Sequence, residues 1–295
     1  MLMAQPTSEV IEMARQQHQR VSVVGDRLPA LMSARHPLAM VYGGGGVFGI
    51  AYTSGVAAGL AAAGVPVATA PSLGTSAGSW TASALALGLS YDDLSVVTSP
   101  RVPTWRTGVL ADVARQLFGE QRHPLVAVSA VCVRTRRRHV LDGARFPLAD
   151  LVAASSAVPG LFPPHRVDGR LYVDGGMWSA TSVDAAAEAD QVIVVAPLAG
   201  LVLGPLGGTA GLLLERELRR WRVRHPESTV TLIRPDLAMA RLAGLHPLAL
   251  FDDARAHDVY PLAYEQGLRI GEAQTEDRQY RPGSGTSRGF ARPAR

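Results

Sequence analysis

The chain has 295 residues, of which 47% are hydrophobic and 18% charged, and its formal net charge is +4. This composition is typical of a globular protein with a large buried core, so it excludes an intrinsically disordered chain. Every basic residue is an arginine, and aromatic residues do not alternate with the arginines as they would on a nucleobase-stacking surface, so we expect no nucleic-acid partner.

The first part of the chain alternates buried strands with helices. The apolar residues 38–42 predict a strand, and residues 49–64, rich in small side chains, predict a tightly packed helix that stops at a glycine. A second strand then ends near residue 75, and a second helix follows over residues 76–88. This alternation predicts an α/β fold with a mostly parallel central sheet.

The middle of the chain adds a pair of strands, 125–133 and 138–143, joined across an arginine-rich run. The single cysteine, Cys132, lies in the first of them, cannot form an internal disulfide, and is expected to be buried. We then predict a helix at 147–158, short strands on both sides of the Asp168-Gly169 turn, a strand at 191–197, an amphipathic helix at 211–224, a strand at 228–235 and a last helical stretch at 252–273.

The arginine-rich runs 134–139 and 219–225 are interpreted as solvated faces of a hairpin and a helix, with contact to anionic lipid headgroups as the alternative. For the domain organisation we expect an N-terminal helical extension at 1–36, one catalytic domain at 37–274, and a disordered tail, rich in glycine, arginine, serine and proline, at 275–295.

Residues 191–214 carry no charge and are numerous enough to span a bilayer. They contain Pro197, Pro205 and five glycines, and they begin like a buried parallel strand. We therefore interpret them as a strand followed by an apolar surface loop, not as a transmembrane helix. The first residues lack the pattern of a secretory signal, and we expect a cytoplasmic protein that contacts membranes only peripherally.

A run of glycines, GGGGVFG at 43–49, lies between the first strand and the first helix. Gly44, Gly46 and Gly49 satisfy the G-x-G-x-x-G pattern of dinucleotide-binding folds. That pattern also requires an acidic residue about 20 residues further on, and none is present there. Unhindered backbone amides at a helix N-terminus equally suit the oxyanion of a reacting ester, and we favour this second interpretation.

The second strand-to-helix junction reads GTSAG, residues 74–78, which is the G-x-S-x-G pattern of a nucleophile elbow. Gly74 and Gly78 remove Cβ atoms where such a turn crowds the backbone, so that Ser76 can project above the sheet edge. The alternative is that Ser76 is an ordinary helix N-cap. Its position at a predicted strand-to-helix junction favours a nucleophile.

A serine nucleophile needs a general base, and the chain offers two schemes. In a triad the base would be one of the late histidines, His225, His246 or His257, although none of them follows a strand in a suitable loop. In a dyad the base would be Asp174, which ends a predicted strand in the sequence YVDGG. An aspartate would need close contact with Ser76 in a dry pocket, since its ordinary pKa is about 3.9.

The motifs GGGGVFG, GTSAG and DGG occur in the order and contexts of the patatin-like phospholipase family, and the chain resembles that family over roughly residues 38–197. The segment AASSAVPGLFPP at 153–164 also resembles bacterial members. The resemblance implies a three-layer α/β/α fold, a lipid acyl ester hydrolase and no metal or cofactor. The site residues it implies are the dyad Ser76 and Asp174, an oxyanion hole at Gly44, Gly45 and Gly46, and the supporting glycines Gly49, Gly74, Gly78, Gly175 and Gly176.

One position departs from the family pattern. Phe48 stands where the family usually has arginine or lysine, and we hypothesise that it favours neutral esters over charged headgroups. It also leaves open a non-catalytic lipid-binding or regulatory protein with the same fold. An α/β-hydrolase or acyltransferase that uses a late histidine is the other alternative. Residues 159–164 and the apolar loop after Pro197 are the expected walls of an acyl-chain site, and the oligomeric state is left open.

Overall fold

The computed structural model describes residues 29, 34–96, 100, 102–200, 202 and 204–280. Nearly all of the N-terminal extension predicted at 1–36, and the chain beyond residue 280, therefore lie outside the described residues. The last helix, α10 (Asp253–Tyr280), continues past residue 274. The boundary predicted there thus falls inside this helix and not at the start of a tail.

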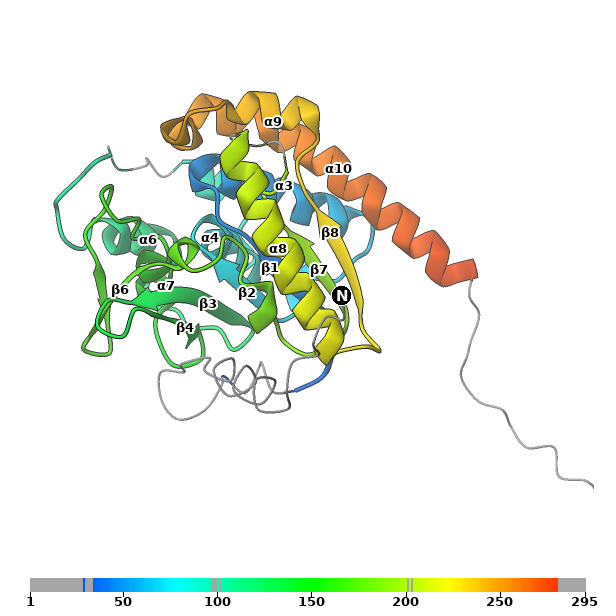
Figure 1. Ribbon diagram of the computed structural model, residues 1–295, viewed down its shortest axis with the longest axis horizontal. Coiled ribbons are helices and arrows are strands. Elements are labelled where there is room, and N and C mark those ends of the chain that lie inside the picture. Colours follow the sequence, from blue (N-terminus) through cyan, green and yellow to red (C-terminus); the bar gives the residue numbers. More distant parts are fainter. Residues whose placement is uncertain are drawn as a thin grey trace, which may run out of the picture.

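One mixed sheet forms the middle layer of the fold (Figure 1). Its path runs β5-β6-β3-β2-β1-β7-β8, and β4 pairs with β3 off this path. Neighbouring strands among β1, β2, β3, β7 and β8 are parallel, whereas β4, β5 and β6 join by antiparallel pairing. The predicted α/β fold with a mostly parallel sheet is confirmed. The strands are β1 (His36–Tyr42), β2 (Ser72–Thr75), β3 (Val126–Cys132), β4 (Arg137–Asp142), β5 (His165–Val167), β6 (Arg170–Asp174), β7 (Ala189–Val195) and β8 (Thr229–Ile233).

Helices cover both faces of this sheet. Side chains along β1 alternate between two hydrophobic clusters, with Met40 and Tyr42 in one and Ala39 and Val41 in the other. The second cluster includes the apolar face of α8, which crosses one side of the sheet in Figure 1, while α3 and α10 lie on the other side. The main helices are α3 (Gly46–Ala62), α4 (Ala77–Ala86), α5 (Tyr91–Ser95), α6 (Val109–Phe118), α7 (Leu148–Ser155), α8 (Pro205–Arg224) and α9 (Leu237–Ala243), besides α10.

The small residues of α3 allow it to pack closely along α10. A Cβ atom on Gly59 would lie 2.1 Å from the carbonyl oxygen of Tyr264, and one on Gly267 would lie 2.2 Å from that of Val56. Such approaches are possible only without side chains, since real Cβ contacts are much longer. The tight packing predicted for this helix is therefore observed.

The uncharged segment 191–214 contains the end of β7 and the beginning of α8. Because α8 begins at Pro205, the predicted apolar loop is shorter than expected and gives way to helix earlier than residue 211. Proline suits this first helical position, where its missing amide hydrogen would have no partner. Among the described helices, none combines the length and apolarity needed to cross a membrane.

Candidate active site

The ends of two strands bring Ser76 and Asp174 together on one edge of β3. Strand β4 occupies the other edge of β3, pairing with residues 127–132. On the shared edge, β2 runs parallel to β3 up to the pair Thr75↔Ser129, and β6 runs antiparallel up to the pair Asp174↔Ala130. The two strands therefore meet end to end, and Ser76, directly after β2, lies beside Asp174.

Ser76 has the backbone of a nucleophile elbow. Its φ is 50° and its ψ −118°, a conformation that residues with a side chain rarely adopt. The turn is crowded, because a Cβ on Gly78 would lie 2.0 Å from the carbonyl oxygen of Tyr42, and one on Gly74 would lie 2.5 Å from the Cα of Ser79. Both glycines of GTSAG are therefore required by the space available, as the motif predicts.

Ser155, the last residue of α7, connects the elbow to β3 by hydrogen bonds. Ser155 Oγ accepts a hydrogen bond of 2.8 Å from the backbone amide of Ser76 and donates one of 2.7 Å to the carbonyl of Ser129. Next to it, Ser156 Oγ accepts a bond of 3.0 Å from the indole of Trp80. The motifs do not predict these roles. The only signal for them in the sequence is AASSAVPG, a stretch that carries part of the family resemblance.

Asp174 is buried, with 3% of its surface exposed, and its carboxylate accepts a hydrogen bond of 2.5 Å from the backbone amide of Gly176. The Ser76 side chain lies close enough to this carboxylate to lower its pKa. Burial raises the pKa of Asp174 to about 6, and the Ser76 side chain and the amide of Gly176 oppose that rise. A carboxylate with a pKa near neutrality is a stronger base than a solvated aspartate. Gly175 must lack a side chain, since a Cβ there would lie 2.2 Å from the carbonyl oxygen of Ser129.

The glycine run passes directly above the elbow. A Cβ on Gly44 would lie 3.2 Å from the Cβ of Ser76, and one on Gly49 would lie 3.0 Å from that of Ala77. The amide of Gly44 already donates a 2.8 Å hydrogen bond to the carbonyl of Ala180. This corrects the expectation for Gly44: its amide is engaged by the protein and serves to hold the loop.

Gly45 and Gly46 differ from Gly44 in this respect. No described residue accepts a hydrogen bond from their amides, and the first intrahelical bond of α3 runs from the amide of Gly49 to the carbonyl of Gly45. Gly46 has a φ of +61°, and a Cβ there would lie 2.7 Å from the carbonyl oxygen of Leu250. The loop thus leaves two amides at the N-terminus of a long helix, where negative charge is stabilised.

An open cavity of about 350 Å³ begins at Ser76. This volume lies within the usual range for small-molecule sites, about 300–1,000 Å³. Its apolar lining includes Ile50, Trp80, Leu94, Leu110, Val113 and Phe162. Phe162 belongs to the predicted acyl-chain wall at 159–164, whereas no residue of the apolar loop after Pro197 is among the described lining residues. Leu110 and Val113 lie on α6, a helix that the sequence patterns did not predict.

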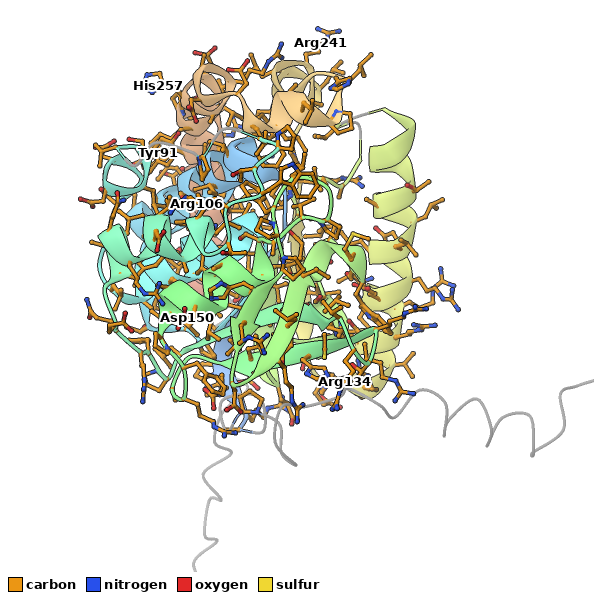
Figure 2. The ribbon with its side chains drawn as sticks, turned by 90° about the vertical axis from the view of Figure 1, so that its left-hand side faces the viewer. Tyr91, Arg106, Arg134, Asp150, Arg241 and His257 are labelled. Carbon is orange, nitrogen blue, oxygen red and sulfur yellow. The ribbon has the colours of Figure 1, made fainter. Side chains whose placement is uncertain are left out.

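The polar groups of the cavity lie mostly at its rim. They include Tyr91, Asp253 and His257, and Figure 2 shows Tyr91 and His257 on the same side of the molecule. His257 is exposed on α10. The other two late histidines have local roles: His225 ends α8 against the ring of Trp221, and the His246 side chain accepts from the amide of Leu248. Among the described contacts, no histidine is hydrogen-bonded to Ser76 or Asp174.

Phe48 is fully buried in the main hydrophobic cluster and is absent from the described lining of the cavity. The structure thus gives Phe48 a packing role in the core and no place in the described cavity wall. We expect Phe48→Arg to lower the free energy of unfolding by at least about 3 kcal/mol, because the change places an unpaired charge in the core. Denaturant unfolding measures this, with Phe48→Leu as the milder control. Unchanged stability with altered ester preference would restore the specificity hypothesis.

Within the described residues, no group of three or more histidine, cysteine, aspartate or glutamate side chains is arranged to hold a metal ion. Cys132 is buried and unpaired, as expected.

Comparison with known proteins identifies one matching family. Residues 103–187 match the family model described as patatin-like phospholipase, so the resemblance predicted from the sequence is confirmed. The matched stretch includes Asp174 but neither Ser76 nor the glycine run. No curated protein matches the chain. Among solved structures, VipD from Legionella pneumophila is similar, with 14% identity and a TM-score of 0.43, over 81% of this chain and 67% of VipD.

Proposed function

We propose that this chain, which carries a patatin-like phospholipase domain, is a serine acyl hydrolase that cleaves carboxylic ester bonds of lipids. The observation that carries the proposal is the close approach of Ser76, which lines an apolar cavity, to the buried carboxylate of Asp174. A serine with an adjacent base, an oxyanion site and an apolar cavity together meet the requirements of acyl transfer.

In the first half-reaction Ser76 Oγ attacks the ester carbonyl carbon while Asp174 accepts the hydroxyl proton. The carbonyl oxygen becomes an oxyanion, which the amides of Gly45 and Gly46 stabilise, each contributing about 3 kcal/mol to the transition state. As the C–O bond breaks, Asp174 passes the proton to the departing alkoxide. The products of this step are the free alcohol and an acyl group on Ser76.

In the second half-reaction water attacks the acyl-enzyme while Asp174 takes a proton from that water. As the bond between the acyl carbon and Ser76 Oγ breaks, Asp174 returns this proton to Oγ, so the fatty acid is released and free Ser76 is regenerated. The acyl chain lies in the apolar cavity beside Trp80, Leu110 and Phe162, because burial of its methylene groups is favourable at about 0.8 kcal/mol each. The alcohol part of the ester points to the rim, where the polar side chains lie. We therefore expect esters with an extended acyl chain to be preferred over acetate.

The proposal is tested with the purified chain, p-nitrophenyl esters from acetate to palmitate, a panel of phospholipids and neutral glycerides, and labelling by a fluorophosphonate. We expect turnover that rises with acyl length above acetate, and covalent labelling. A folded chain that binds lipid vesicles without turnover or labelling would support the non-catalytic alternative. Turnover that disappears when His257 is replaced, while Asp174→Asn remains active, would support the histidine triad.

The pH dependence of the reaction follows from the environment of Asp174. The carboxylate must be ionised to accept a proton, and its pKa is raised to about 6 by burial. We expect kcat/KM to be constant above that pH and to fall about tenfold per pH unit below it. A midpoint near 4 would mean that the carboxyl is solvated in the active enzyme. Because a histidine base would also titrate near 6.5, the midpoint is measured again in His257→Ala, where a dyad enzyme keeps it.

A further inference from the structure

The irregular segment Ser179–Ser182 links the two halves of the candidate site. On one side, the carbonyl of Ala180 accepts the 2.8 Å hydrogen bond from the amide of Gly44. On the other side, Ser182 Oγ donates a 2.9 Å hydrogen bond to Ser129 Oγ, and the carbonyl of Ser129 accepts from the serine that supports the elbow. The position of this segment therefore decides where the glycine loop lies relative to the nucleophile.

The side chain of Ser179 holds this segment in its conformation through three hydrogen bonds. Its Oγ accepts hydrogen bonds from the amides of Thr181 at 3.2 Å and Ser182 at 2.8 Å, and it donates its own proton to Glu217 Oε2 at 2.9 Å. Thr181 Oγ1 lies 3.5 Å from the same carboxylate oxygen. Because Ser179 accepts two amides and donates to one carboxylate, Glu217 fixes the direction of its hydroxyl.

Glu217 projects from the face of α8 that packs on the sheet, next to Leu214, Leu218 and Trp221. Burial and the nearby carboxylate of Asp184 raise the pKa of Glu217 to about 7, against the effects of Ser179, Arg138 and Thr181. Arg138 is already bonded to both carboxylate oxygens of Asp184, at 2.5 and 3.0 Å. The described hydrogen bonds of Glu217 therefore come from Ser179 and Thr181 and not from Arg138. Burying the carboxylate in this place costs free energy, because its charge loses contact with water.

We propose that Glu217 is a positioning residue for the oxyanion loop, which is the glycine run that contains Gly44, Gly45 and Gly46. From α8, Glu217 holds the segment 179–182. The Ala180 carbonyl in this segment fixes the amide of Gly44 and thereby the direction of the amides of Gly45 and Gly46. The inference rests on the proposed function for its catalytic consequence, because oxyanion stabilisation depends on donors that are already oriented before the reaction. Its structural consequence, an ordered glycine loop, does not depend on any activity.

The catalytic consequence is tested by Glu217→Ala, with ester hydrolysis as the readout. We expect kcat to fall about tenfold and KM to stay unchanged, because the lost orientation matters only when the oxyanion forms. Glu217→Gln keeps an oxygen that accepts from Ser179 and should retain most of the activity. Ser179→Ala should repeat the effect of Glu217→Ala, and the double variant should be no slower than the slower single variant, since both changes break one chain of contacts.

The matched control is Glu215→Ala, which removes an exposed carboxylate from the same helix and should leave kcat unchanged. The structural consequence is tested by amide hydrogen exchange at Gly44 in the same variants. Exchange should be at least about tenfold faster in Glu217→Ala than in the parent or in Glu215→Ala. Unchanged exchange at Gly44, or equal loss of kcat in Glu217→Ala and Glu215→Ala, would overturn the inference. If the parent hydrolyses no ester, the proposed function fails, and the exchange result alone decides the role of Glu217.

Discussion

Ser76→Ala is expected to lower kcat for ester hydrolysis by at least about 10⁴-fold and to abolish fluorophosphonate labelling. The variant keeps the backbone of the elbow and the hydrogen bond from its amide to Ser155, so the oxyanion loop and the cavity should remain in place. Only the attacking oxygen is lost, and no covalent acyl intermediate can form. The measurement is turnover of a p-nitrophenyl ester together with labelling, both at matched protein concentration.

The control for this variant is Thr229→Ala, which also removes one hydroxyl, here an exposed one at the beginning of β8. Ser76 follows the carboxyl end of β2 in the same sheet, so the control changes the sheet away from the candidate site. It should keep full turnover and labelling. Equal unfolding free energies for the parent and Ser76→Ala would show that lost activity does not reflect lost structure. Persistent labelling of Ser76→Ala would instead indicate another nucleophile, and Ser156, which also lines the cavity, would be tested next.

Asp174→Asn is expected to have two opposite effects, a loss of activity of at least about 10³-fold and a gain of stability. The activity falls because an amide cannot accept the proton of Ser76. The stability rises because the buried carboxylate costs free energy when it ionises: its pKa is about 6 in the folded protein, against an ordinary value of 3.8. The difference corresponds to about 3 kcal/mol above the folded pKa.

The sign of this effect can be checked through its pH dependence. Since the folded state holds the proton of Asp174 more tightly, this residue leaves stability unaffected below about pH 4, lowers it progressively between about pH 4 and 6, and lowers it by a constant amount above that. Asp174→Asn should therefore be more stable than the parent at pH 8 and similar to it at pH 4. Denaturant unfolding at both pH values provides the measurement.

Asp190→Asn is the control for the charge change. Asp190 is an exposed residue of β7 that pairs with Arg35 on the surface, an interaction that contributes little to stability. We expect Asp190→Asn to leave activity unchanged and to alter stability equally little at pH 4 and pH 8. An active Asp174→Asn would contradict the dyad, whereas an inactive variant that is less stable than the parent at pH 8 would contradict the desolvation argument.

Helix α8 shows which features of Glu217 the sequence pattern could predict and which it could not. In the amphipathic helix predicted at 211–224, Leu214, Leu218 and Trp221 have the spacing of one helix face, and all three are buried. Glu217, three positions after Leu214, lies on that same face, so the spacing also places a carboxylate toward the sheet. Its partners could not be predicted, because Ser179 and Thr181 lie in an irregular segment far away in the sequence.

What the sequence determined by itself is local. The strand and helix pattern, the elbow at residues 74–78 and the need for its glycines follow from side-chain periodicity and from the space around a tight turn, and both are properties of neighbouring residues. The family resemblance likewise depends on short motifs and their order. The order of residues along the chain was therefore enough to make Ser76 and Asp174 candidate catalytic residues.

The tertiary structure decided what depends on residues distant in the chain. The meeting of β2 and β6 end to end along β3 brings Ser76 beside Asp174, and burial in that place raises the pKa of the carboxylate. The same packing occupies the amide of Gly44 with the carbonyl of Ala180, which removes one predicted oxyanion donor and leaves two. Desolvation and hydrogen bonding are set by the groups that surround an atom in space, so no local pattern along the chain could have specified them.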